Sequence, residues 1–308
     1  MKVLGRIKGV LCALMLMLTG LFISMPAAYA DEVPEYRLQV SPARLDLELK
    51  PGETTTAKFK IQNTGSKAFD YIVLAAPYSV DDEKYSVNVD KETAYTDLAK
   101  WITFSQDKGN IEADKEQEIT VMATVPKDVP AGGQYASILV RMDLPASGSD
   151  ESGVDISQQV GILTYSSVDG KTRKEGKILE NKVPSFMFAP PISATALVEN
   201  TGNVHVDAEY ILQVSNFFGG EEVYSNEESP EVRTVLPETR RLNTISWDGA
   251  PHLGIFKVKQ TVKFLGETKT TEKLVFICPI WLLFIILAII FLIIFLIVNR
   301  AIKGGRKE

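Results

Sequence analysis

Short segments in which apolar and polar residues alternate limit the fold of this 308-residue chain more than any other feature. Leu45, Leu47 and Leu49 alternate with charged residues, and Pro51-Gly52 then ends the segment with a turn. The same period recurs at 37–40, 56–61 and 118–125, and segments at 71–75 and 135–142 are further predicted strands. Successive side chains of a β-strand point to opposite faces, so a two-residue period predicts half-buried strands. The middle of the chain is therefore predicted to be all-β, with antiparallel sandwiches.

Few segments of this central region have a helical period. The exception is 97–104, where a turn of helix would place Trp101 and Phe104 on one side. The chain has two cysteines, Cys12 and Cys278, so residues 31–274 form no internal disulfide. Without disulfides an exported domain depends on core burial and needs roughly 100 residues, which predicts two domains. Cys278 is interpreted as a small apolar residue rather than as an intermolecular disulfide partner.

A weak internal repeat indicates that the two domains are related. Ile61-Gln62-Asn63-Thr64-Gly65 is echoed by Val198-Glu199-Asn200-Thr201-Gly202, and Asp70 and Asp207 each stand seven residues after the Asn. Asn and Gly tolerate positive φ, so the repeat is interpreted as strand–turn–strand and not as a site.

Tyr135 suggests the type of sandwich and helps to place the domain boundary. It follows a Pro- and Gly-rich turn and begins a strand, as in the tyrosine corner of Ig-like sandwiches, and Phe256 is predicted to be its equivalent. Strands at 160–165 and 177–179 are expected to close the first unit, which places the boundary at Val183-Pro184. We therefore predict two Ig-like domains, 31–183 and 184–274, and an exposed flexible loop at 146–153.

The N-terminus predicts a cleaved signal peptide over residues 1–30. Lys2, Arg6 and Lys8 precede an apolar run at 10–23, and Ala28-Tyr29-Ala30 then supplies a small-residue cleavage site. An uncleaved anchor is the alternative, but the run is shorter than the roughly 20 residues that span a bilayer. Cys12 lies too early for lipoprotein processing.

The C-terminus predicts a transmembrane helix at 275–298. Residues 277–298 contain no charge, Trp281 lies near one end, and Arg300 and Lys303 follow the other. The positive-inside bias places a basic tail, 299–308, in the cytoplasm, which predicts a single-pass cell-membrane protein with an extracytoplasmic N-terminal region. A buried core helix is the alternative, and a sortase anchor is disfavoured because no LPxTG-like motif is present.

The charge of the predicted ectodomain limits its partners. Without the three basic residues of the signal, and the four basic and one acidic residue of the tail, 26 basic and 38 acidic residues remain, a net charge of about −12. Nucleic acid and anionic lipid need dense Lys and Arg, so both are disfavoured as ligands.

Part of the chain resembles a known group of bacterial surface proteins. The residues that carry the resemblance are Asn200-Thr201-Gly202-Asn203-Val204-His205-Val206, Asn216-Phe217-Phe218-Gly219, Val235-Leu236-Pro237, Arg240 and Trp247. The layout is similar to that of the Gram-positive WxL-interacting cell-surface proteins, which implies peptidoglycan binding by the first domain and host-ligand binding by the second. The opening Val40-Ser41-Pro42-Ala43-Arg44-Leu45 is instead closer to pilus-chaperone-like Ig domains. No binding residue is carried over.

No pattern of catalytic or metal-binding residues emerges. His205 and His252 have no histidine or cysteine neighbours for zinc, and His205 is expected at an exposed strand position between Val204 and Val206. The acidic clusters are 81–83, 150–151, 221–222 and 227–228, all in polar turns. Calcium at these loops is an alternative, but no alternating Asp loop is present. We therefore predict no catalytic residue, no cofactor and no metal.

Loop aromatics are a possible binding signal. Phe186 and Phe188 are expected between the units and Phe217-Phe218 in a loop, where core and interdomain packing is the favoured explanation. The function predicted first is a non-enzymatic surface-binding or scaffold protein, with cell-wall glycan or another surface protein as partner. The alternatives are a chaperone-like assembly factor with an open sheet edge and an extracytoplasmic hydrolase.

Overall fold

The structure of the chain is a computed structural model that describes residues 35–143 and 158–304. In its last helix the side chains are described up to Ile294 and at Ile297. The predicted signal peptide, 1–30, and the predicted flexible loop, 146–153, lie outside the described residues.

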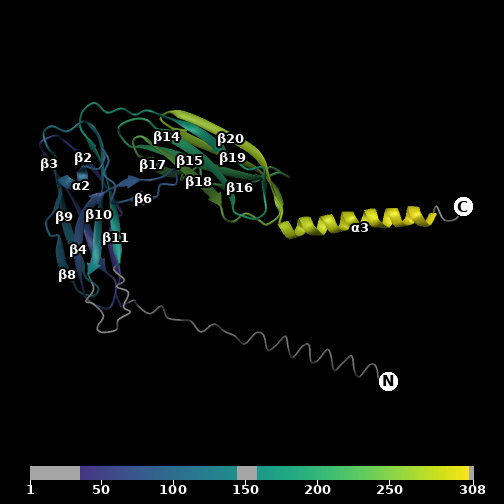
Figure 1. Cartoon of the computed structure of the whole chain (residues 1–308), viewed down its shortest axis with the longest axis horizontal. Coiled ribbons are helices and arrows are strands. Elements are labelled where there is room, and N and C mark those ends of the chain that lie inside the picture. The colour runs from purple at the N-terminus through teal and green to yellow at the C-terminus, as the bar shows by residue number, and fades with distance from the viewer. Residues whose placement is uncertain (1–34, 144–157, 305–308) are drawn as a thin grey trace, which may run out of the picture.

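The first half of the described chain forms a β-sandwich of two sheets (Figure 1). One sheet has the order β1 (Leu38–Ser41), β3 (Thr54–Asn63), β9 (Glu116–Thr124) and β7 (Ile102–Phe104). The other has the order β2 (Arg44–Leu49), β11 (Gln159–Val168), β10 (Gly132–Asp143), β4 (Phe69–Pro77) and β8 (Lys108–Ile111). The chain changes sheets at the cis Ser41–Pro42 peptide, after which β2 runs parallel to β11.

The second half forms another sandwich. Its smaller sheet has the order β12 (Gly176–Lys182), β14 (Ile192–Asn200) and β18 (Thr239–Trp247). Its larger sheet has the order β13 (Phe186–Met187), β20 (Glu267–Ile277), β19 (Gly254–Phe264), β15 (Val206–Asn216) and β16 (Glu222–Ser225), and β17 (Glu231–Val235) also pairs with β15. The predicted all-β sandwich architecture is confirmed.

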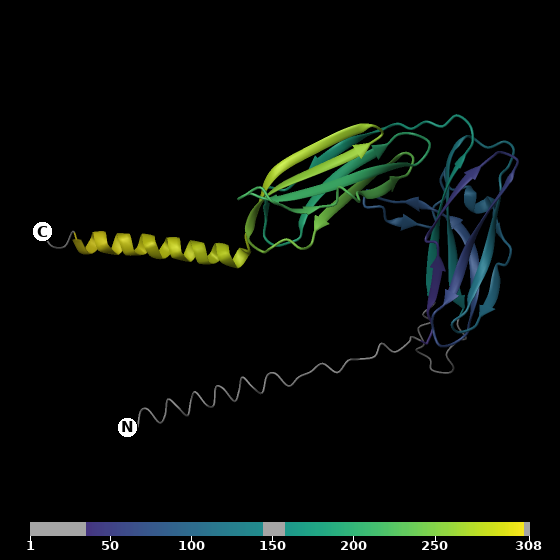
Figure 2. The same ribbon diagram turned by 180° about the vertical axis from the view of Figure 1, so that it is seen from behind.

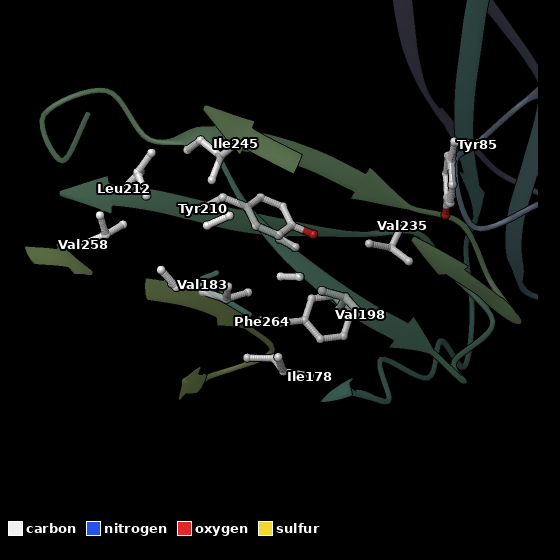
Figure 3. Packing of buried hydrophobic residues seen from close by; sticks show 14 of the residues in the cluster. Tyr85, Ile178, Val183, Val198, Tyr210, Leu212, Val235, Ile245, Val258 and Phe264 are labelled. Carbon is white, nitrogen blue, oxygen red and sulfur yellow. The ribbon is translucent and has the colours of Figure 1, made fainter. Parts of the chain in front are cut away.

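Alternating side chains build both cores, as the sequence predicts. In β2 the three leucines are buried and the residues between them are exposed. Figure 3 shows the second core, in which Tyr210 and Phe264 lie between the sheets among aliphatic residues such as Val198 and Val258. Burying apolar surface at about 25 cal/mol per Å² is the main stabilising contribution in domains that have no disulfide.

Strand pairing divides the chain earlier than the sequence predicts. The predicted strand at 177–179 is part of β12, which pairs with β14, and its Ile178 lies in the core of the second sandwich. Val183, placed at the end of the first domain by the sequence, lies in the same core. The sheets therefore separate between Val168 and Gly176.

A hairpin of the first half reaches the second sandwich. It consists of β5 (Ser79–Val80) and β6 (Val87–Asn88) and precedes α2 (Leu98–Trp101), the predicted helical turn. The two sandwiches lie at an angle to each other, with the hairpin between them in both views (Figures 1 and 2).

The C-terminal helix α3 (Ile280–Gly304) forms over the predicted apolar segment, directly after the buried Cys278. A membrane span needs about 20 consecutive apolar residues to cross a hydrocarbon core of about 30 Å. Within residues 35–143 and 158–304, no helix is found to be long and apolar enough to cross a membrane. On this finding we correct the predictions of a transmembrane helix at 275–298, a cytoplasmic tail at 299–308, a cell-membrane localisation and the membrane as a partner.

Candidate functional site

Arg44 joins the two sandwiches at one side of their junction. It lies at the start of β2, and its guanidinium carbon is 4.1 Å from the centre of the Tyr165 ring on β11. The same guanidinium forms an ion pair of 2.6 Å with Asp46 and donates to Thr234 Oγ1 of the second sandwich at 2.9 Å. A cation over an aromatic face contributes about 0.5–2 kcal/mol, depending on its exposure. Arg44 is thus engaged in holding the junction.

Tyr85 repeats this arrangement from the hairpin. Arg241 of β18 lies 4.1 Å from the centre of its ring, and its hydroxyl accepts the Leu236 N–H at 2.7 Å. The Leu242 N–H donates to the Glu83 carbonyl at 2.6 Å, so the hairpin tip pairs with the outer edge of β18. Figure 3 shows Tyr85 at the first-sandwich end of the second core, to which it belongs. Tyr85 has φ of 65°, which is unfavourable for a bulky residue and is sustained by these contacts.

His205 lies between Tyr135 and Tyr165 of the first sandwich, with edge-on ring contacts of 5.6 and 5.4 Å between centroids. Its backbone N–H donates to the Tyr135 hydroxyl at 2.9 Å, and that hydroxyl is 3.2 Å from His205 Nδ1. Burial, and then the charge of Arg44, lower the pKa of His205. Both effects favour the neutral imidazole, and its Nδ1 shares a hydrogen bond with the Tyr135 hydroxyl.

Two predictions are wrong at this position. His205 is half-buried at the domain junction, not at an exposed strand position, because the tyrosines of another domain cover it. Tyr135 contacts the second sandwich, whereas a tyrosine corner would bond within its own domain. Residues 70 positions apart meet here, which a local pattern does not reveal.

Next to the junction, β11 has an open edge. Its C-terminal part, from Leu163 to Val168, pairs with β2, and the Leu163 N–H donates to the Ala43 carbonyl at 3.1 Å. Because β2 begins at Arg44, residues 159–162 have β10 on one side and no paired strand on the other among the described residues. Groups on a strand alternate in direction, so the backbone N–H and C=O of Gln159 and Gly161 point to this open side. Both residues are exposed. β1 runs beside this side of β11 without pairing with it, since it belongs to the facing sheet, and its Leu38 N–H donates to the Gln158 side chain at 3.4 Å.

The predicted loop aromatics lie together at the far end of the second sandwich. Phe186 contacts Phe188 and Phe276, so these residues are not between the units as expected. Phe217 and Phe218 contact each other in the turn after β15 and are 47% and 78% exposed, so core packing does not explain them.

The acidic clusters do not converge. Asp81 is bonded to Asn88 and then to Lys91, which lower its pKa, and Asp82 accepts from Ser86. The pairs at 221–222 and 227–228 lie around β16, and 150–151 lie outside the described residues. In the described part of the chain, no three His, Cys, Asp or Glu residues are grouped so as to hold a metal ion.

Sequence reasoning missed Arg44, Tyr85 and Arg241 as junction residues. The Val40–Leu45 opening drew attention to Arg44, but nothing in the sequence indicated its aromatic partner 121 residues away. The chaperone-like alternative predicted that an open sheet edge would exist, but the sequence did not indicate that this edge lies on β11.

No protein-family model matches the sequence, and no curated protein matches it. Several solved structures have a similar arrangement of strands. The class 5 fimbriae chaperone CfaA is 10% identical, with 77% of this chain and 99% of that chain covered and a TM-score of 0.39. The CsuC–CsuE chaperone–tip adhesion subunit pre-assembly complex of Acinetobacter baumannii is 13% identical, with 77% of this chain and 98% of that chain covered and a TM-score of 0.38. The E. coli chaperone DraB is 12% identical, with 77% of this chain and 97% of that chain covered and a TM-score of 0.37. The resemblance to WxL-interacting proteins stays a prediction.

Proposed function

We propose that this protein is a non-enzymatic, chaperone-like assembly factor that holds an extended segment of an exported envelope or surface protein. This is the alternative that the sequence left open beside the surface-binding and scaffold function. In the CsuC–CsuE structure described above, a chaperone forms a pre-assembly complex with a tip adhesion subunit. The proposal assigns to this chain only that class of partner.

The open edge of β11 is the observation that supports the proposal. Free N–H and C=O groups on an exposed strand are a template for an added strand, whose main-chain hydrogen bonds supply affinity. Lys and Pro commonly protect such edges, whereas residues 159–162 read Gln-Val-Gly-Ile.

The rigid junction beside the edge favours a binding function. The hydrogen bond from Arg44 to Thr234, and the contacts of Tyr85 with Arg241 and Leu236, fix the second sandwich against the first, beside the sheet that contains β11. A preorganised frame loses little conformational entropy when it binds an extended partner.

The experiment replaces Gly161 with proline or alanine. G161P removes an outward N–H and leaves the ladder to β10 intact, because proline is tolerated at a strand edge. G161A keeps the N–H and adds a methyl group 3.1 Å from Ser137 Oγ, which has to shift by only a few tenths of an ångström.

Full-length wild type and both variants are used to capture proteins from envelope extract. Each captured protein is then purified, and its aggregation after dilution from denaturant is measured with each variant. Wild type and G161A should suppress aggregation of the same client, and G161P should lose at least tenfold in apparent affinity. The scaffold function would instead be supported if wild type and G161P are retained equally on insoluble cell wall and no client is protected from aggregation.

A further inference from the structure

The outer face of the sheet that contains β11 carries an apolar row that ends at the open edge. Leu74 on β4 is paired with Leu139 on β10, and Leu139 is paired with Gly161 on β11. Leu74 is 40% exposed and Leu139 is half-buried. Cross-strand neighbours on one face are in direct reach of each other, so this row is continuous up to Gly161.

Gly161 leaves a slot at the end of this row. A Cβ placed there would lie 3.1 Å from Ser137 Oγ and 3.4 Å from Leu139 Cδ2. The missing side chain therefore exposes the flank of Leu139 toward the open edge. A glycine inside a strand marks a place where another backbone or a ligand approaches closely.

The apolar row also continues into the domain junction. Leu163 is the next outward-facing residue of β11, and it packs against the core of the second sandwich. Tyr165, two residues further, lies within that junction. An added strand would thus extend a surface that already binds another part of the protein.

Charge does not define the partner at this position. Arg141 faces outward beside Gln159 and forms no ion pair among the described residues, but Asp143 and Asp70 lie on the same face one row away. Because charges of both signs lie here, neither an acidic nor a basic partner segment is favoured. Apolar contacts therefore supply the selectivity for the segment.

We propose that the segment bound by β11 places a large apolar side chain, above all an aromatic ring, opposite Gly161, where it covers the glycine and contacts Leu139. This inference rests on the proposed function and specifies what the partner segment must contain. An aromatic residue opposite a glycine restores the side-chain contact that the glycine lacks.

The test uses nine-residue synthetic peptides of alternating Thr and Ser that carry a central Phe or Ala and a fluorescent label. Their binding to the full-length chain is measured by anisotropy. We expect the Phe peptide to bind roughly five- to tenfold more tightly than the Ala peptide, the range of one favourable aromatic contact.

Three variants locate the contact. G161V fills the slot, so the preference for Phe should fall below about twofold while the Ala peptide still binds. G161P should weaken both peptides, and Q159V, on the same face and edge, should retain the preference. Thermal unfolding confirms that each variant is folded.

The outcomes separate this inference from the proposed function. If both peptides bind equally well and G161P abolishes their binding, the aromatic contact at Gly161 is wrong, but strand addition at the β11 edge is retained. No peptide binding, together with no protected client, would overturn both. Self-association of the wild type that G161P abolishes would identify a second copy as the occupant and overturn the inference.

Discussion

At the scale of single residues, the two asparagines of the internal repeat perform the same task in each sandwich. Asn63 Nδ2 donates to the Lys67 and Ile111 carbonyls, and its Oδ1 accepts the Gly65 N–H at 2.9 Å. Asn200 makes the equivalent bonds to Val204, Val235 and Gly202. Both side chains are at most 1% exposed, so each satisfies buried backbone groups that would otherwise be unpaired.

The glycines of the repeat have a role that differs from the one predicted. Neither Gly65 nor Gly202 has positive φ, so turn conformation does not require them. A Cβ at Gly65 would lie 2.7 Å from the Arg37 nitrogen, and one at Gly202 would lie 2.2 Å from the Arg173 oxygen. Each glycine is needed because the backbone that leads into its own sandwich passes directly over it.

We predict that N63A and N200A each lower the free energy of unfolding by about 2–4 kcal/mol, because each leaves several buried polar groups unpaired. The control is Q62A, which removes one exposed hydrogen bond to Glu116 and should cost less than about 0.5 kcal/mol. Urea unfolding measures all three variants. An N200A variant as stable as Q62A would contradict this account of the repeat.

At the scale of elements, β12 decides where the second sandwich begins. It covers one edge of β14, and Asn181 donates to the Lys269 carbonyl at 2.7 Å and so ties β12 to β20. The sequence of β12 has one apolar pair, Ile178-Leu179, between polar residues, so its pattern alone does not assign it to either sandwich.

We predict that a fragment of residues 170–279 folds, whereas a fragment of residues 184–279 does not. The shorter fragment lacks β12 and Val183, which exposes both the edge of β14 and the core around Val198. Circular dichroism and a cooperative thermal transition distinguish the two. Equal folding of both fragments would place β12 outside the cooperative unit.

At the scale of the whole molecule, the junction makes stability depend on pH through His205. Its pKa is lowered by burial and by Arg44, so the folded protein binds fewer protons than the unfolded chain below the ordinary pKa of about 6.5. Stability therefore rises with pH through the window between the lowered pKa and about 6.5, and is lost as pH falls through it.

We predict that lowering the pH from 7.5 to 5 reduces the melting temperature less in H205Q than in the wild type, because the variant has no imidazole to protonate. H252Q is the matched control, since it makes the same His-to-Gln change at an exposed position. Calorimetry at several pH values measures the difference. Identical pH profiles for H205Q and wild type would show that His205 does not couple protonation to folding.

The sequence by itself determined the local structure of this protein. Period-2 alternation identified strands such as β2, β3 and β9, and the Asn-Thr-Gly repeat identified two related sandwiches, because each signal depends on neighbours within a few residues. Tertiary structure alone decided where the sandwiches meet, to which sandwich β12 belongs, and which part of β11 lacks a paired strand. Arg44 with Tyr165, Tyr85 with Arg241, and His205 with Tyr135 are contacts across 70 to 156 positions. Such contacts follow from the way that whole sheets pack, and no local period records them.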